Sequence, residues 1–252
     1  MIRYDTKTWF RHIVHFHRSD TMRQLVPEIL IISIYTIGLT YVAKNYWHDY
    51  GNLSNTTTVH SLIGFVIGLL MVFRTNTAYD RWWEGRKHWG ALVNNTRNLA
   101  LRLNAFLSED DKENRNFFKT MIPNYVWAMK EHLREGVQIE EIDDIEGLLT
   151  ELEKKDHKPN HIAGRLYKRI KKLQAEGKIS NEEQLMLDKE AKAFLDIIGA
   201  CERIRNTPIP YAYSLFIKKV IFFYSMTLPF GFIPDFGYWT ALVVVFIFYV
   251  LV

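Results

Sequence analysis

The charged residues of this chain are segregated, and this limits the possible folds more than any other feature of the sequence. Four stretches of 14 to 17 residues carry almost no charge, namely 29–43, 59–73, 220–233 and 236–252. Each is slightly shorter than the roughly 20 apolar residues that span a bilayer core, so one run alone could be a buried helix of a soluble protein. Four such runs favour membrane insertion, although the overall charged fraction of 24% is ordinary for a soluble protein.

The residues that flank these runs support a membrane location. Tyr46, Trp47 and Tyr50 close the first run, and Tyr238 and Trp239 open the last one. Amphipathic rings favour the headgroup zone at both edges of a bilayer. The flanks therefore indicate where the runs leave the membrane.

Basic residues gather on one side of the runs. Those that precede the first run are Arg3, Lys7, Arg11, Arg18 and Arg23, and those that follow the second are Arg74, Arg81, Arg86 and Lys87. The two short connections, between the first and second runs and between the third and fourth, contain only one lysine or arginine, Lys44. The positive-inside rule therefore predicts that both termini and the long middle segment are cytoplasmic. The net charge of +4 follows from these residues, and the sequence has no motif for reading nucleic acid.

The middle of the chain reads as long amphipathic helices, because Leu92, Leu99, Leu103 and Phe106 recur at helical spacing. We expect an all-α membrane protein in which 1–252 form a single domain, with membrane helices at about 25–47, 58–74, 215–233 and 236–252 and a helical cytoplasmic region at about 75–214. Ser108 with Asp111, and Ser180 with Glu183, resemble capping boxes. The acidic, poorly periodic segment 135–160 is expected to be a solvated insertion with a short helix near 145–152.

The second apolar run contains two stripes of helical spacing. Gly64 and Gly68 form a GxxxG pair, which lets a neighbouring backbone approach closely. Phe65, Leu69 and Phe73 recur every fourth residue, about 100° round the helix from the glycines. The aromatic and leucyl side chains face lipid or a protein core, or else line a hydrophobic constriction between several copies of the helix. Periodicity does not decide between these alternatives.

Two motifs resemble the bestrophin family, in particular its bacterial members. The first is "NTAYDRWWEGRKHWGALVNN", in which the anchor triplet Arg81, Trp82 and Trp83 follows the second run. The second is "TPIPYAY", residues 207–213, which is similar to the segment that enters the family's third membrane helix. The order of the four runs agrees with the family, so the resemblance spans nearly the whole chain.

The resemblance implies a homopentamer with four membrane helices per subunit and one axial pore for small monovalent ions. In the family, three apolar residues of the second helix line the pore neck, and these positions correspond to Phe65, Leu69 and Phe73. An isoleucine forms a second, cytoplasmic aperture, which corresponds to Ile209. Chloride conduction is favoured because animal members pass anions, and cation conduction stays the alternative because some bacterial relatives favour cations. We expect lipids and monovalent ions as partners and the bacterial inner membrane as the location.

The animal members also carry an acidic calcium clasp after the fourth membrane helix. This chain stops at Val252, inside the expected fourth helix. Calcium gating therefore cannot be carried over, and a C-terminal portion of the protein is expected to be missing. No cofactor is implied.

Two other classes of function remain open. A metal-dependent membrane enzyme would use "HIVHFH", with His12, His15 and His17, or the pair His157 and His161. The first cluster has few carboxylates nearby and a proline splits the second, so ordinary surface histidines are the favoured interpretation. A non-conducting membrane scaffold would explain the helices and glycines equally well. Hydrolase chemistry is not expected, because the sequence has no nucleophile elbow, phosphate-binding glycine loop or CxxC pair.

Overall fold

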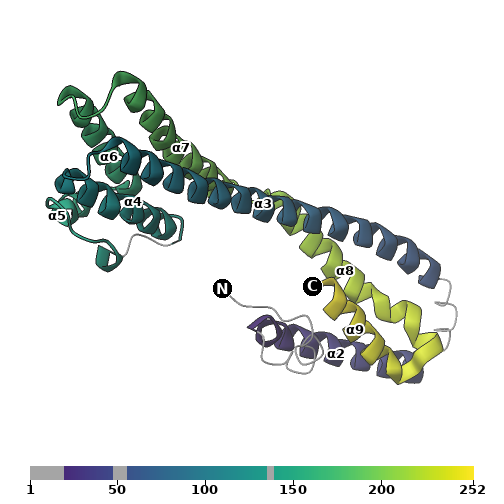
Figure 1. The fold of residues 1–252 in the computed structure, drawn as a ribbon. Helices are drawn as coiled ribbons and strands as arrows, with labels where there is room; N and C mark the ends of the chain where they lie inside the picture. The colour runs from purple at the N-terminus through teal and green to yellow at the C-terminus, as the bar shows by residue number, and fades with distance from the viewer. Residues whose placement is uncertain (1–19, 48–55, 135–138) are drawn as a thin grey trace, which may run out of the picture. The chain divides into compact units, whose positions relative to one another are not determined.

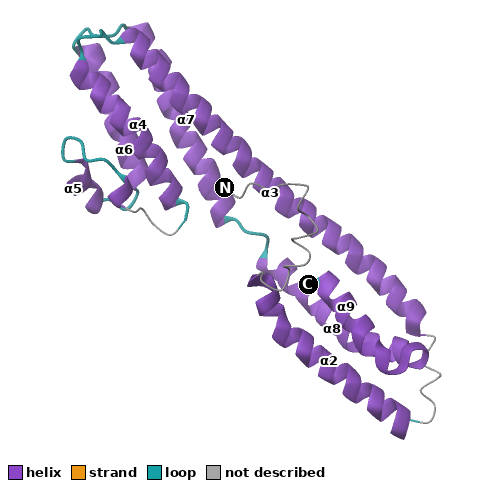
Figure 2. Cartoon of the chain, turned by 60° about the horizontal axis from the view of Figure 1, so that its bottom comes forward, coloured by secondary structure: helices purple, strands orange, loops and turns teal. Residues whose placement is uncertain are grey.

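The computed structural model describes residues 20–47, 56–134 and 139–252, and within these ranges all regular secondary structure is helical (Figure 2). The α-helices are α2 (Asp20–Tyr46), α3 (Thr56–Phe106), α4 (Lys112–His132), α5 (Leu148–Glu153), α6 (Lys158–Ala175), α7 (Asn181–Asn206), α8 (Tyr211–Phe236) and α9 (Thr240–Leu251) (Figure 1). Two 3-10 helices, η4 (Ile139–Glu141) and η5 (Gly237–Trp239), complete the list. The predicted all-α class is confirmed.

The chain divides into two compact units. The first, here called the membrane unit, comprises Met1–Asn76 and Ile209–Val252, and the second, here called the polar unit, comprises Thr77–Pro208. Helix α3 contributes its first part to the membrane unit and the rest to the polar unit. The expectation that 1–252 act as a single domain stays a prediction.

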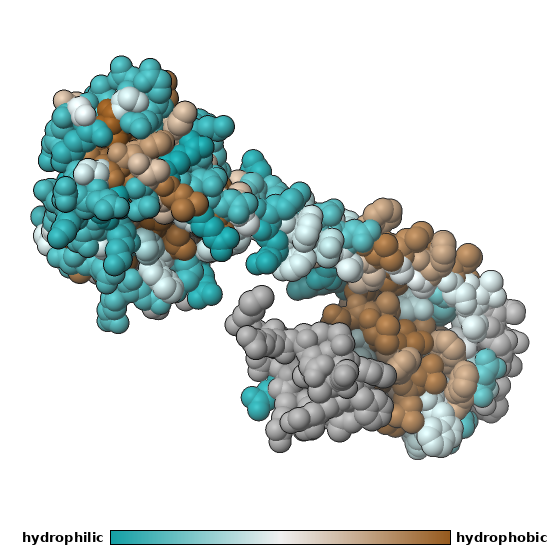
Figure 3. Space-filling model, in the orientation of Figure 1, coloured by the Kyte–Doolittle hydropathy of each residue, from teal (hydrophilic) through white to brown (hydrophobic). Residues whose placement is uncertain are grey.

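In the membrane unit, α2, α8 and α9 pack against one another, and the first part of α3 adds to their common core. Ile32, Ile67, Ile221 and Val244, one from each helix, are buried there. A hydrogen bond from the hydroxyl of Thr57 to the carbonyl of Gly231, 3.1 Å long, ties α3 to α8. Much of the outward surface is also apolar, as the brown areas of Figure 3 show.

Among the residues that the structure describes, three helical stretches are long and apolar enough to cross a membrane. They lie within Leu25–Tyr46, Thr56–Phe106 and Asn181–Leu251. The third stretch contains both C-terminal apolar runs, which the short helix η5 joins. A membrane protein is therefore the supported class, and the count of four crossings stays a prediction.

The polar unit is built around apolar side chains from α3, α4, α6 and α7. Leu92, Leu99 and Leu103 of α3 are buried at the helical spacing that the sequence predicts. The ring of Tyr125 stacks on Phe194 with 4.8 Å between centroids, and its hydroxyl donates a 2.6 Å hydrogen bond to the Phe194 carbonyl. The surface of this unit is mainly polar, shown teal in Figure 3.

One of the two predicted capping boxes is confirmed and the other is wrong. The Ser180 side chain accepts a hydrogen bond from the Glu183 amide at the start of α7, and the Glu183 carboxylate accepts one from the Ser180 amide. At α4 the cap is Asp111, whose carboxylate accepts a hydrogen bond from the Asn114 amide. Aspartate caps as well as serine, and Asp111 directly precedes the helix, whereas Ser108 lies outside it.

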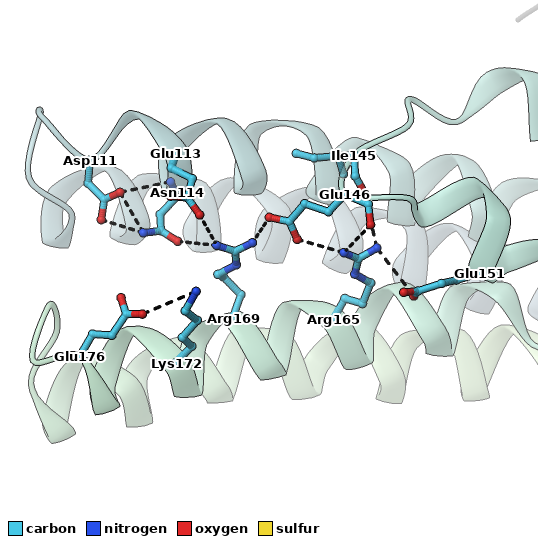
Figure 4. A network of polar contacts seen from close by, with 10 residues as sticks. All are labelled: Asp111, Glu113, Asn114, Ile145, Glu146, Glu151, Arg165, Arg169, Lys172 and Glu176. Carbon is cyan, nitrogen blue, oxygen red and sulfur yellow. Dashed lines mark hydrogen bonds and ion pairs between the residues drawn. The ribbon is translucent and has the colours of Figure 1, made fainter.

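The acidic segment after α4 is less solvated than its composition suggests. Ile142, Leu148 and Leu152 are buried in the core, so the expectation of a solvated insertion is wrong for this part, while α5 confirms the short helix. Its carboxylates bind arginines of α6 (Figure 4). Arg169 pairs with Glu146, and a second pair joins Arg165 Nη2 to Glu146 Oε2 over 3.0 Å. Part of the acidic composition, at Glu141, Glu146 and Glu151, therefore serves ion pairing.

Candidate functional site

The predicted pore-neck residues lie on one exposed face of α3. Phe65, Leu69 and Phe73 are 67%, 45% and 62% exposed, whereas Ile67, on another face, is 1% exposed. None of the three side chains belongs to the buried core of the membrane unit. A stripe of this kind faces either lipid or further copies of the protein.

The two glycines of the GxxxG pair have different surroundings. A Cβ added at Gly64 would lie 3.0 Å from the Tyr224 hydroxyl oxygen, so Gly64 lets α8 approach α3 closely. A Cβ added at Gly68 would meet no atom within 4 Å. Of this pair, Gly64 contributes to helix packing within one chain. Gly68 could contribute to helix packing only against a second chain.

Ile209 lies in the short non-helical connection 207–210 between α7 and α8. Prolines on both sides of it fix their own φ angles and provide no amide donor, which explains why neither helix continues through this segment. The chain therefore makes a non-helical turn directly before α8. Ile209 itself is half-buried.

Arg81 binds the end of α7, a role that the sequence did not reveal. Its guanidinium donates to the carbonyl of Ile204 over 2.6 Å and to the carbonyl of Thr207. A cation is favourable at a helix C-terminus, where the last carbonyls have no partner within the helix. Arg81 therefore holds the chain two residues before Ile209. Only the tertiary contact between α3 and α7 discloses this role.

The two tryptophans of the anchor triplet lie outside the core. Trp82 and Trp83 are 56% and 48% exposed, and their rings, with centroids 6.1 Å apart, form a cluster with Tyr79. Their exposure suits rings that meet lipid headgroups, and the interfacial role stays a prediction. Nearby, Glu84 Oε1 pairs with Arg203 Nη2 over 2.9 Å, a second link from α3 to α7.

The two histidines that the sequence placed together, His157 and His161, contact different carboxylates. His161 Nε2 lies 2.7 Å from Glu151 Oε2, while His157 Nε2 lies 2.8 Å from Glu202 Oε1. His132 Nε2 lies 2.8 Å from the same Glu202 oxygen. Burial opposes ionisation of Glu202, but the hydrogen bonds from both histidines outweigh it and lower its pKa. The segment with His12, His15 and His17 lies outside the described residues.

The chain is similar to bacterial bestrophins over its whole length. A family model described as "Bacterial/Fungal Bestrophin protein" matches residues 1–252. A voltage-dependent anion channel-forming protein of Nostoc sp. is 38% identical over 71% of this chain and 60% of its own length. Another, from Ralstonia nicotianae, is 29% identical over 96% of this chain and 79% of its own length. The match thus spans less than two thirds of the Nostoc protein.

The fold is also similar to solved structures. A bacterial bestrophin homologue from Klebsiella pneumoniae, solved as a variant, superposes with a TM-score of 0.79 at 25% sequence identity. The superposition covers 90% of this chain and 85% of that one.

Proposed function

Because the chain belongs to the bacterial and fungal bestrophin family, we propose that it forms a membrane channel for small monovalent anions such as chloride. Three similar proteins, from Nostoc sp., Ralstonia nicotianae and Synechocystis sp., are named voltage-dependent anion channel-forming proteins. The exposed stripe of Phe65, Leu69 and Phe73 carries the proposal within this chain. A channel for ions has no need of catalytic residues, and we propose no enzymatic activity.

The proposed assembly is a homopentamer with α3 next to the axis. One subunit cannot enclose a path that only one of its helices lines, so several copies must contribute the stripe. Five copies of Phe65, Leu69 and Phe73 would then form the neck, and five copies of Ile209 a second narrow ring. Gly68, open within one chain, is free to pack against a neighbouring subunit.

In the proposed pore, the neck controls passage through hydration. Phenyl and leucyl side chains offer an ion no ligand, so a narrow ring of them is crossed only by an ion that gives up part of its water. The cost reaches several kcal/mol for a dry constriction. Selectivity between anions and cations then comes from the electrostatic field of the surrounding basic residues rather than from the neck.

The proposed orientation places both termini and the polar unit in the cytoplasm of a bacterium, with the apolar helices in the inner membrane. The distribution of lysine and arginine supports it. Single cysteines at Asn55 and Asn181 test it, because an impermeant thiol reagent added outside cells should label only the first. The native Cys201 is buried and is replaced by serine in the background used for labelling.

The reversal potential in asymmetric NaCl tests the function directly. Purified protein reconstituted into a planar bilayer with a tenfold gradient should reverse close to the Nernst potential of chloride. Reversal close to the sodium potential would replace the proposal by a cation channel of the same architecture. Intact oligomers without any current would assign the protein to the non-conducting scaffolds.

A further inference from the structure

Three metal-ligand side chains from three helices meet inside the polar unit. His132 is the last residue of α4, His157 caps the start of α6, and Glu202 lies near the end of α7. Their ligand atoms all lie within 4.8 Å of one another. Helix α6 packs against both α4 and α7, so a packed bundle positions the group (Figure 1).

We propose that His132, His157 and Glu202 bind a zinc-class divalent transition-metal ion. Two imidazoles and one carboxylate are a ligand set that zinc accepts, with a water in the fourth position. Ligands at about 2.0–2.1 Å from zinc stand roughly 3.3 Å apart in a tetrahedron. The two 2.8 Å contacts to Glu202 would lengthen by about half an ångström, and the two imidazole nitrogens, within 4.8 Å of each other, would settle at the same spacing. Calcium and magnesium prefer oxygen ligands and are not expected here.

The three side chains are accessible to an ion from solution. The side chains of His132, His157 and Glu202 are 23%, 33% and 28% exposed. Their partial burial limits competition from water while leaving a path for entry. The guanidinium of Arg205, which donates to the His132 carbonyl over 2.5 Å, is a nearby positive charge that opposes a cation, and the Glu202 carboxylate offsets it.

The hydrogen bonds of His157 fix the proton balance of metal binding. Its Nδ1 accepts from the Asn160 amide over 3.2 Å and caps α6, so in the neutral ring Nε2 carries the proton and donates to Glu202. A metal at Nε2 needs that lone pair, so the proton moves to Nδ1 and the cap bond breaks. The backbone N–H of Asn160 is exposed, so it can donate to water instead. Metal binding and the helix cap therefore compete for one ring.

This competition provides a sharp variant. Asparagine is a preferred N-cap residue, so His157→Asn retains the cap of α6 and removes the metal ligand. Glu202→Gln retains the size and an acceptor oxygen and removes the charge. His161→Asn is the matched control, because His161 lies in the same helix and pairs with Glu151 instead.

The test is titration of the purified full chain in detergent with ZnCl₂, followed by calorimetry, and does not depend on the proposed channel function. The wild type and His161→Asn should each bind one more zinc ion per chain than His157→Asn and Glu202→Gln do. If the two ligand variants still bind this ion, their affinity for zinc should be at least about tenfold weaker. Zinc bound by His12, His15 and His17 is common to all four proteins and cancels in this comparison. Cobalt should produce visible absorption of a four-coordinate site in the first two proteins only.

Equal zinc stoichiometry and affinity in all four proteins would overturn the proposal and leave the cluster as a hydrogen-bonded triad. Displacement of the zinc by an equal concentration of calcium or magnesium would overturn the assigned metal class. Circular dichroism of each variant establishes that the helices are intact, so that a loss of binding reports the ligand.

Discussion

The two halves of α3 place their large apolar side chains in opposite surroundings. In the membrane unit, Phe65 and Phe73 are more than 60% exposed, whereas in the polar unit Leu99 is fully buried. Water makes exposure of an apolar side chain costly, while lipid does not. In the part of α3 that belongs to the polar unit, hydrophobic periodicity therefore identifies the side chains of a core. In the part that belongs to the membrane unit, the same periodicity does not tell whether a side chain faces protein or lipid, although both parts belong to one helix.

The largest expected effect of a substitution on stability is in the polar half. Leu99→Ala should lower the free energy of unfolding by about 2–5 kcal/mol, because it removes a fully buried side chain and leaves a cavity. Leu101→Ala on the same helix is the control, since Leu101 is 68% exposed, and its change should stay within about 0.5 kcal/mol. Denaturant titration of the protein in detergent measures both. Equal losses would remove the contrast between a buried and an exposed leucine.

The sequence predicted the features that follow from local rules, namely buried apolar spacing and helix capping, and few of the contacts between residues far apart in the chain. The helical spacing of Leu92, Leu99 and Leu103 and the capping box at Ser180 follow from local rules, and both are confirmed. The contacts of Arg81 with the end of α7 connect residues 123 and 126 positions apart, and no spacing rule detects them.

The metal candidate shows the same limit. His157 and His161 are close in sequence but bind different carboxylates, and His157 instead shares Glu202 with His132. These three residues come from three helices, so only the packing of α4, α6 and α7 brings them together. The pore assignments came from family resemblance, because periodicity cannot distinguish a stripe facing lipid from one facing an axis.

A smaller effect is expected where α3 holds the end of α7. Arg81→Gln should destabilise this segment by about 1.5–3 kcal/mol, because hydrogen bonds from a charged donor are lost at a helix C-terminus. Hydrogen exchange should accelerate at the Thr207 amide, which donates to the Arg203 carbonyl over 3.0 Å. Arg86→Gln, exposed on the same helix, should leave exchange unchanged. Unchanged exchange in Arg81→Gln would contradict a holding role.

The neck stripe should respond in current rather than in stability. Replacing Phe65, Leu69 and Phe73 together by alanine widens the proposed constriction and should raise single-channel current severalfold, about 1 kcal/mol in barrier height. Ile63→Ala, about 120° round the helix from Leu69 and 39% exposed, is the control and should conduct like the wild type. An unchanged current in the triple variant would assign the stripe to lipid.

The smallest effect is expected at Asp111, where the sign of the pH dependence is informative. Burial opposes ionisation of this carboxyl, but hydrogen bonds from Asn114 and Lys178 outweigh it and lower its pKa. Because the pKa is lower in the folded state, the stabilisation is fully present above the unfolded pKa, near 4, and is lost as the pH falls through the folded value.

Asp111→Asn tests this contribution, because asparagine also caps helices and keeps one acceptor oxygen. It removes the charge that pairs with Lys178, 3.0 Å away, and one of the two oxygens that accept from the Asn114 side chain. At pH 7 the variant should be less stable than the wild type by up to about 1 kcal/mol. The difference should shrink below pH 4, where the wild-type carboxyl takes up its proton. Denaturant midpoints of both proteins between pH 7 and pH 3 measure it. A difference that grows on acidification would mean that the carboxylate destabilises the fold, the reverse of what its contacts imply.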